Sequence, residues 1–434
     1  MKHAVASKPL FRVHSEFSKA VSAQSLMDQS YLEEVFNNLQ RWSQAQDYAG
    51  YDPFDGLNSR LFSATRLRHS RTTRLLWTQL IKRSPVNLRP LVRVSPGRNP
   101  KGIALFTLAA LSRHRQSKTE TTEQQCRLLL ERLISMKLDG WSGAAWGYNF
   151  DWQSRVLFAP RRSPTVVPTA FAAKALLDAG ETLGEQRYFD IARNVCDFIL
   201  QDLRRPVDTE NELCFSYSPS SATRVYNASL LAGEVLIRVA AVTNDDYLRE
   251  AGTRALRYVL GQQRVNGSWT YGADKNQGWV DNFHTAFLLS SLSRIAMTGI
   301  SLPEIDAALS NGFRYWRSTF FLAEGWPKYY DDALYPADTH CAAAAIATLC
   351  DLRPVFPEAI SHAQQIAKWT IEHLWDPRGF FYYQRRRYFT VRTPFIRWSE
   401  AWMLYALARL LEELNRPHSK PENVQSTPKE QACR

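Results

Sequence analysis

The sequence predicts an all-α protein in which two concentric rings of six helices form an (α/α)6 toroid, a six-hairpin barrel with short aromatic-rich loops on one rim. The first observation is a polar residue followed by a small one at the head of five apolar stretches, at spacings of 58, 58, 55 and 60 residues: Thr169, Asn227, Thr285, His340 and Glu400. The second is an alternation of apolar and amphipathic helices, and the third is a recurring aromatic loop. Such a period indicates repeated units that share one core.

The apolar helices should form the inner ring, because a helix that is apolar on most faces is a buried one. They are expected near residues 102–114, 167–179, 225–241, 283–297, 338–350 and 398–414. The amphipathic helices of the outer ring are expected near residues 122–137, 187–203, 246–262, 303–319 and 358–374. A helix from the N-terminal section, where residues 31–46 and 72–84 read as helices, completes the outer ring. Residues 31–415 then form one toroid domain, flanked by disordered segments at 1–30 and 416–434.

Composition places the chain among globular proteins, with 45% hydrophobic and 22% charged residues in 434. No segment approaches the roughly 18 uncharged apolar residues of a membrane span, and the first 30 residues lack the pattern of a secretory signal. Six cysteines without CxxC spacing fit reduced thiols. We therefore expect a cytoplasmic protein, of an oligomeric state that the sequence leaves open.

The formal net charge of +12 is concentrated in basic runs: Arg66, Arg68, Arg71 and Arg74; Arg161 and Arg162; Arg385 to Arg387. These runs are either solvated surface or a site for a polyanion. No nucleic-acid-binding motif accompanies them, so no nucleic acid is expected as a partner. An acidic polysaccharide or an anionic membrane surface, bound peripherally, remains as the alternative to plain solvation.

A glycine- and aromatic-rich loop precedes five of the inner helices, at residues 145–148, 214–217, 267–271, 325–330 and 379–383. Connectivity places these loops on the rim where the inner helices begin. Their rings either plug the barrel mouth or stack on the C–H faces of sugars. On the second interpretation, the predicted substrate-binding residues are Trp146, Tyr148, Trp152, Asn227, Trp269, Tyr271, Asn282, Trp326, Tyr329, Arg397 and Trp398.

Ionisable residues gather near the repeated polar positions and are the candidate catalytic groups: Asp281, His284, Asp338, His340, Glu400 and, further upstream, Asp151. A lone Asp before a helix is usually a cap, but two His–Asp groupings fall at equivalent places in adjacent repeats and should face each other across the cavity. Partial desolvation at the head of an apolar helix could raise the pKa of Glu400 towards general-acid use. No metal and no cofactor is expected.

The segments Trp146–Gln153, Trp279–Thr285 and Tyr335–His340 resemble bacterial exopolysaccharide-cluster proteins of the VpsJ type, from about Tyr51 to Leu411. More distantly, the architecture resembles the six-hairpin glycosidase superfamily, the toroid polysaccharide lyases and the glucuronyl C5-epimerases. The resemblance implies a role in building or trimming surface polysaccharide.

The distant relatives imply two mechanisms. In the first, two carboxylates hydrolyse a glycosidic bond, with Glu400, Asp281, Asp338 and Asp151 as candidates. In the second, the C5 proton of a uronate is abstracted, and Asn282 with His284 is similar to the Asn–His pair of such enzymes, although Phe283 separates the two residues here.

Two further function classes remain open. The segment Gln263–Trp269 fits the QxxxGxW pattern of terpene cyclases and protein prenyltransferases, which are also α/α toroids. On that reading Asp338, His340 and His284 would resemble a zinc site. The last alternative is a non-catalytic glycan-binding scaffold of an export machinery. The sequence gives neither the sugar nor the linkage.

Overall fold

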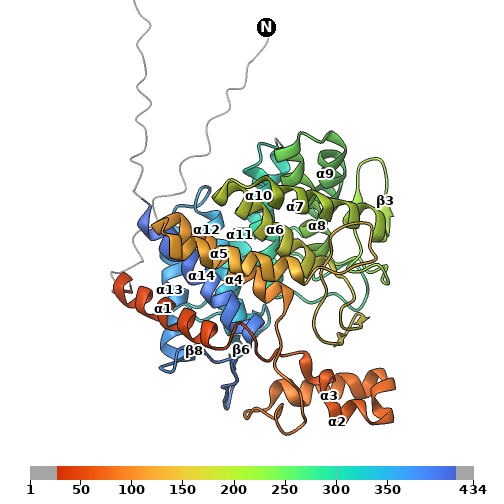
Figure 1. Cartoon of the computed structure of the whole chain (residues 1–434). Coiled ribbons are helices and arrows are strands. Elements are labelled where there is room, and N and C mark those ends of the chain that lie inside the picture. Colours follow the sequence, from red (N-terminus) through yellow and green to blue (C-terminus); the bar gives the residue numbers. More distant parts are fainter. Residues whose placement is uncertain (1–26, 301, 417–434) are drawn as a thin grey trace, which may run out of the picture.

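The computed structural model describes residues 27–300 and 302–416 of the chain. Most of the segments expected to be disordered, together with Cys433, lie outside the described residues. Within the described part, helices account for nearly all regular structure (Figure 1).

The inner ring consists of six helices: α4 (Pro100–Ser117), α6 (Val166–Leu183), α8 (Tyr226–Thr243), α10 (Asn282–Ala296), α12 (Thr339–Leu352) and α14 (Ala401–Asn415). Each packs against the next, and α14 packs back against α4, which closes the ring. These helices are apolar and alanine-rich, so they are buried on nearly all faces. Their N-termini lie at one rim of the ring.

The outer ring consists of α1 (Gln29–Ala45), α5 (Glu120–Ser135), α7 (Gln186–Asp197), α9 (Asp246–Leu260), α11 (Pro303–Phe320) and α13 (Ala359–Leu374). Five of them follow the inner helix on which they pack, and α1 packs against α14 to complete the sixth hairpin. Each buries one stripe, as in α1 with Leu32, Val35, Phe36 and Leu39. The predicted all-α toroid is confirmed.

Two irregular turns were not predicted. A π-turn (η5, Ile396–Glu400) precedes α14, where the sequence predicts regular helix from residue 398, and a second π-turn (η4, Phe198–Asp202) ends the outer helix that begins with α7. Such turns are frequent at functional sites. Here η5 carries Arg397 and Trp398 at the mouth of the ring.

Short strands, which were also not predicted, stiffen the rim loops. Three hairpins are formed by β1 (Trp152–Gln153) with β2 (Phe158–Ala159), β3 (Val207–Asp208) with β4 (Leu213–Cys214), and β7 (Trp375–Asp376) with β8 (Phe380–Phe381). A four-stranded antiparallel sheet has the order β10 (Thr390–Val391), β9 (Gln384–Arg385), β6 (Ala333–Asp338), β5 (Lys328–Tyr330). Segments of two or three residues are too short to show an alternation in sequence.

The chain between α1 and α4, residues 50–99, forms what we call the N-terminal cap. It contains η2 (Asp55–Asn58), α2 (Arg60–Ser63), η3 (Arg66–His69) and α3 (Arg71–Arg83). Figure 1 shows it in orange, projecting beside the helix rings. Inside it, the buried Arg89 donates to Asp55 at 2.6 Å and to the carbonyl oxygen of Asp52 at 2.6 Å. The cap therefore has its own polar fastening beside the toroid core.

Five cysteines of the described part, Cys126, Cys196, Cys214, Cys341 and Cys350, are buried free thiols. Among the helices of residues 27–300 and 302–416, none is long and apolar enough to cross a membrane.

Candidate functional site

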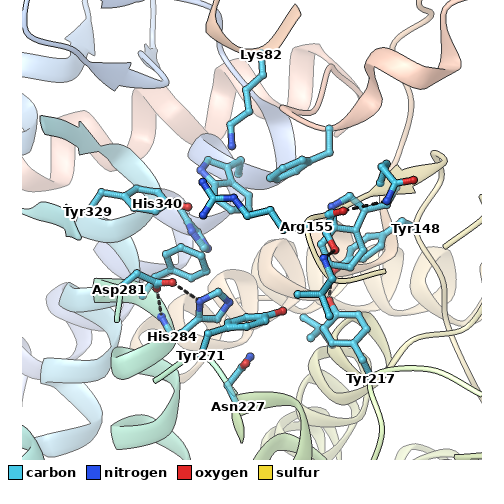
Figure 2. A pocket seen from close by; sticks show the side chains of 18 of the residues that line it. Lys82, Tyr148, Arg155, Tyr217, Asn227, Tyr271, Asp281, His284, Tyr329 and His340 are labelled. Atoms are coloured by element: carbon cyan, nitrogen blue, oxygen red, sulfur yellow. Dashed lines mark hydrogen bonds and ion pairs between the residues drawn. The ribbon is translucent and has the colours of Figure 1, made fainter. Parts of the chain in front are cut away.

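A cavity of about 210 Å³ lies at the rim where the inner helices begin, between the aromatic loops and the N-terminal cap. Ten of the residues named from the sequence line it: Tyr148, Trp152, Asn227, Tyr271, Asp281, His284, Tyr329, His340, Arg397 and Trp398. In Figure 2 the side chains of Tyr148, Tyr217, Tyr271, His284 and His340 surround one open space. The rim loops and the heads of the inner helices thus converge on one place in the fold.

The first turn of nearly every inner helix supplies a polar side chain to this cavity. Lys101 comes from α4, Asn227 from α8, His284 from α10 and His340 from α12, while η5 supplies Arg397. Inner helices that all begin at one rim necessarily bring their first turns together. The repeated polar position of the sequence therefore marks the wall of the cavity.

Within the rim loops at residues 145–148, 214–217 and 267–271, two aromatic rings go to opposite sides. In the pairs Trp146/Tyr148 and Trp269/Tyr271, the tryptophan lies in the core and the tyrosine two residues later lines the cavity. The rim loop thus contributes one ring to the core and one to the wall. Tyr217 follows the same rule, so its W-x-Y-like position could have identified it although the sequence interpretation left it out.

Four of the predicted substrate-binding residues accordingly lie away from the cavity wall. The indole N–H groups of Trp146, Trp269 and Trp326 donate to the carbonyl oxygens of Leu133, Val259 and Leu334 at 2.8, 3.0 and 3.1 Å. Asn282 accepts from Trp316 and donates to the carbonyl oxygen of Lys328, both at 2.9 Å. These side chains fasten loops to helices, because a buried polar group needs a partner.

The QxxxGxW segment has the same structural use. The Gln263 amide donates to the carbonyl oxygens of Gly267 and Ala308, both at 3.0 Å. Trp269, at the end of the motif, is bonded to the preceding outer helix as described above. The motif therefore joins α9 to the rim loop and to α11, away from the cavity.

Asp281 and His284 form a hydrogen-bonded pair on the cavity wall (Figure 2). Asp281 is the N-cap of α10 and accepts the His284 backbone N–H at 3.0 Å. Its other oxygen accepts the Trp279 indole N–H at 3.0 Å and meets His284 Nδ1 at 2.6 Å. Because a carboxylate only accepts, Nδ1 carries a proton, and in the neutral form of the ring the lone pair lies on Nε2. The pair thus presents a fixed, basic nitrogen.

His340 occupies an aromatic box that shares the Phe283 ring with His284. The Phe283 ring centroid lies 4.0 Å from that of His284 and 4.6 Å from that of His340, and Trp398 lies 4.1 Å from His340. Burial, reinforced by the charges of Lys101 and Arg397, lowers the pKa of His340 well below its usual range. The imidazole is therefore neutral, and neither ring nitrogen has a hydrogen-bond partner in the protein.

Unpartnered polar atoms also occur elsewhere on the wall. Trp152 Nε1 and Asn227 Oδ1 are buried and have no hydrogen-bond partner in the protein. Native structures leave few such atoms unpaired, and each calls for an explanation. Their position among aromatic rings indicates a ligand that carries both hydroxyl groups and apolar C–H faces.

Three predicted catalytic carboxyl groups lie outside the cavity wall. Asp338 is the N-cap of α12 and accepts the Trp398 indole N–H at 3.0 Å. Glu400 is fully buried and accepts the Phe381 backbone N–H at 2.9 Å. Asp151 accepts the backbone N–H of Arg161 at 2.7 Å. The sequence predicts that the pairs Asp281–His284 and Asp338–His340 face each other across the cavity. This prediction is wrong, because Asp338 accepts from the Trp398 indole and from the backbone N–H of His340 and makes no hydrogen bond to the imidazole.

Glu400 makes the same loop contact as two smaller residues, Thr169 and Ser229, make in earlier repeats. Thr169 accepts the Trp146 backbone N–H at 3.0 Å, and Ser229 accepts that of Phe215 at 3.1 Å, just as Glu400 accepts that of Phe381. Burial raises the pKa of Glu400 well above its usual range, which favours the neutral carboxyl group. It fastens a rim loop to its inner helix.

Cations dominate the charge of the wall. Lys82, on α3 of the cap, points into the cavity (Figure 2), with Nζ 4.3 Å from the Phe54 ring centroid. Burial lowers its pKa to about 8. Lys101 lies 4.4 Å from the Phe171 ring centroid, and burial lowers its pKa well below the usual range. Arg155 also reaches the cavity.

Arg397 adds a further positive charge, and its partner comes from the cap. Its guanidinium group donates twice to Asp52, at 2.6 and 2.8 Å.

No sequence pattern points to Lys82, because residue 82 reaches the cavity through tertiary packing alone. Lys101, by contrast, is a lone charge in the first turn of an apolar inner helix, a signal that was available.

Among the described residues, no three His, Cys, Asp or Glu side chains are grouped to hold a metal ion.

Comparisons with known proteins identify the architecture. No protein-family profile and no curated protein sequence matches the chain. The structure is similar to cellobiose 2-epimerase from Bacillus thermoamylovorans B4167, with a TM-score of 0.61 and 12% identity over 89% of this chain and 100% of the other. An unsaturated glucuronyl hydrolase specific for heparin gives 0.57 and 12%, over 89% and 97%. A polysaccharide lyase gives 0.56 and 9%, over 90% and 99%.

At such low identity this likeness shows the fold, that of the α/α toroid enzymes. The distant part of the predicted resemblance is confirmed at that level. The VpsJ-type resemblance stays a prediction, as does the cytoplasmic location.

Proposed function

We propose that this protein is a carbohydrate-active enzyme that moves a proton at a sugar carbon next to a carbonyl or carboxyl group, as an epimerase, isomerase or lyase does. The observation that carries the proposal is the Asp281–His284 pair on the wall of an aromatic cavity. Asp281 fixes the imidazole tautomer so that Nε2 can accept a proton from carbon. The positive side chains of the wall would stabilise the resulting enolate.

His340 supplies the second proton-transfer group. It is neutral and without a protein partner, and it packs on the same Phe283 ring as His284. With His284 as the base that removes a proton from the sugar, His340 would return a proton. Elimination would use the same base, with departure of the substituent on the neighbouring carbon.

Hydrolysis with two carboxylates fits the cavity less well. Of the described residues that line it, Asp281 is the sole carboxylate, and it is bound to His284 and Trp279. A hydrolase of the two-carboxylate type needs one carboxyl group as acid and another as base or nucleophile. The lining of this cavity therefore favours proton transfer at carbon.

The proposed substrate is a sugar that bears an acidic group, as a monosaccharide unit of a polysaccharide or oligosaccharide. Aromatic rings and the unpaired polar atoms of Trp152 and Asn227 suit a pyranose ring. The side chains of Lys82, Lys101 and Arg155 suit a carboxylate. The similar structures include proteins described as epimerase, glucuronyl hydrolase and lyase, and the VpsJ-type resemblance points to an exopolysaccharide pathway.

The test is to incubate the protein in D2O with acidic and neutral oligosaccharides and to follow them by NMR and mass spectrometry. Deuterium uptake without cleavage supports epimerisation or isomerisation, and an unsaturated uronate at the new chain end supports elimination. Addition of water across a glycosidic bond would contradict the proposal in favour of a hydrolase. Binding without exchange or cleavage, on every sugar bound, would leave the glycan-binding scaffold instead.

A further inference from the structure

We propose that the N-terminal cap docks the toroid on an anionic membrane surface, so that the cavity opens beside lipid headgroups. The surface consists of the exposed side chains of α2, η3 and α3 and the loop that follows, residues 60–93. The exposed leucines of α3 lie on a different face of that helix from the residues that line the cavity. The inference rests on the cap alone and holds whether or not the cavity carries out the proposed proton transfer.

The first observation is charge. Between Gly56 and Asn99 the sequence contains ten basic residues and no acidic one, so this short segment holds most of the formal net charge of +12. The two acidic residues of the cap, Asp52 and Asp55, are buried against Arg397 and Arg89. The exposed arginines Arg60, Arg66, Arg68, Arg71 and Arg93 therefore have no acidic side chain of the cap to neutralise them. Such a cluster attracts an anionic surface.

The second observation is apolar exposure within the same segment. Leu76 and Leu80, one turn apart on the outer face of α3, are 65% and 58% exposed, and Leu67 and Leu91 are 54% and 75% exposed. The adjacent face of α3 turns Leu75, Gln79 and Lys82 into the cavity. A helix that exposes leucines beside an arginine-rich segment, here α2 and η3, is suited to lie in a membrane interface.

A neighbouring rim hairpin extends this surface. The tip between β9 and β10 exposes Arg387, Tyr388 and Phe389, with Tyr388 84% exposed. The end of α3 lies beside the base of this hairpin, because Lys82 Nζ is 5.9 Å from the ring centroid of Tyr383, the residue before β9. An aromatic side chain flanked by arginine is well suited to the headgroup region.

The combination of charge and leucine selects a membrane over a soluble polyanion. An acidic polysaccharide would satisfy the arginines, but it offers no apolar phase to Leu76 and Leu80. A bilayer interface offers both, because arginine heads reach phosphates while leucine side chains enter the acyl boundary. Exposed apolar side chains that gather on one face usually mark an interaction site.

Flotation of the full-length protein with vesicles tests the proposal. Vesicles of phosphatidylglycerol and phosphatidylcholine should bind the protein, and vesicles of phosphatidylcholine alone should bind at least tenfold less. The double variant Leu76→Ser/Leu80→Ser and the triple variant Arg60→Gln/Arg66→Gln/Arg68→Gln should each lose at least tenfold in partitioning. Raising the salt concentration should weaken binding further, as expected for exposed charges. Thermal melts should show that the variants stay folded.

Matched variants elsewhere on the surface serve as controls. Leu128→Ser/Tyr247→Ser removes exposed apolar side chains from the outer ring, and Arg257→Gln/Arg314→Gln/Arg317→Gln removes exposed arginines there. Neither should change partitioning. Equal binding by the cap variants and the controls would overturn the proposal. Absence of flotation would also overturn it. So would a dimer in light scattering that the leucine variant abolishes, since this face would then bind a second copy of the chain.

Discussion

The substitution Asp281→Asn tests whether the Asp–His pair performs the chemistry. It removes the charge that meets His284 Nδ1 at 2.6 Å and keeps the shape of the side chain. A hydrogen bond to a charged group contributes about 1.5–3 kcal/mol, which corresponds to roughly 10- to 150-fold in rate. An asparagine amide can also donate to Nδ1, and the ring proton would then sit on Nε2 and block the base. We therefore expect turnover to fall by about a hundredfold or more.

The variant should stay folded and lose at most about 1–3 kcal/mol, because Asn and Asp are about equally good N-caps, while the Trp279 indole N–H loses its acceptor. The side-chain oxygen of the introduced asparagine would still accept the backbone N–H of His284 that Asp281 accepts. The matched control is Asp245→Asn, which changes the N-cap of the outer helix α9 in the same way and leaves the cavity untouched. Its turnover should equal that of the unchanged protein.

The assay is the rate of deuterium exchange from D2O into a sugar on which exchange has first been demonstrated. It measures proton transfer at carbon directly and is combined with a thermal melt of each variant. Near-normal exchange by Asp281→Asn would refute the assignment of His284 as an oriented base. A variant that fails to fold would show instead that Asp281 is a structural cap.

Three further predictions concern the wall, the fastening of the loops and the core. The pKa of Lys82 is lowered to about 8, so this side chain loses its charge as the pH rises through that value. KM for an anionic sugar should therefore rise above about pH 8. The variant Lys82→Met should abolish this rise. Glu400→Gln should leave turnover and melting temperature unchanged. Glu400→Ala should lower the free energy of unfolding in urea by about 1–3 kcal/mol, because the Phe381 N–H is left unpaired. A large loss of turnover in the glutamine variant would show that Glu400 is a catalytic acid. Trp269→Leu should lower the free energy of unfolding by about 3 kcal/mol and leave KM unchanged. Trp152→Ala should raise KM and change the free energy of unfolding little. The reverse pattern would refute the division of the aromatic rings between core and cavity wall.

The sequence by itself determines the architecture and the location of the site. Twelve helices with one apolar set and one amphipathic set can bury their faces only by nesting one ring within the other. Polar residues such as Asn227, His284 and His340 at the heads of the apolar helices then meet at one rim, since all inner helices run in the same direction. Local pattern and connectivity are sufficient for both conclusions.

The tertiary structure alone decides which polar side chain faces the cavity and which fastens a loop. Asp281 and Asp338 look equivalent in sequence and both cap an inner helix, yet Asp281 bonds an imidazole on the wall and Asp338 bonds the Trp398 indole behind it. Lys82 reaches the cavity because the cap folds across the rim, a contact with no local signal. The physical reason is that a buried polar group takes whichever partner the packing brings within hydrogen-bonding distance, and sequence spacing does not encode that partner.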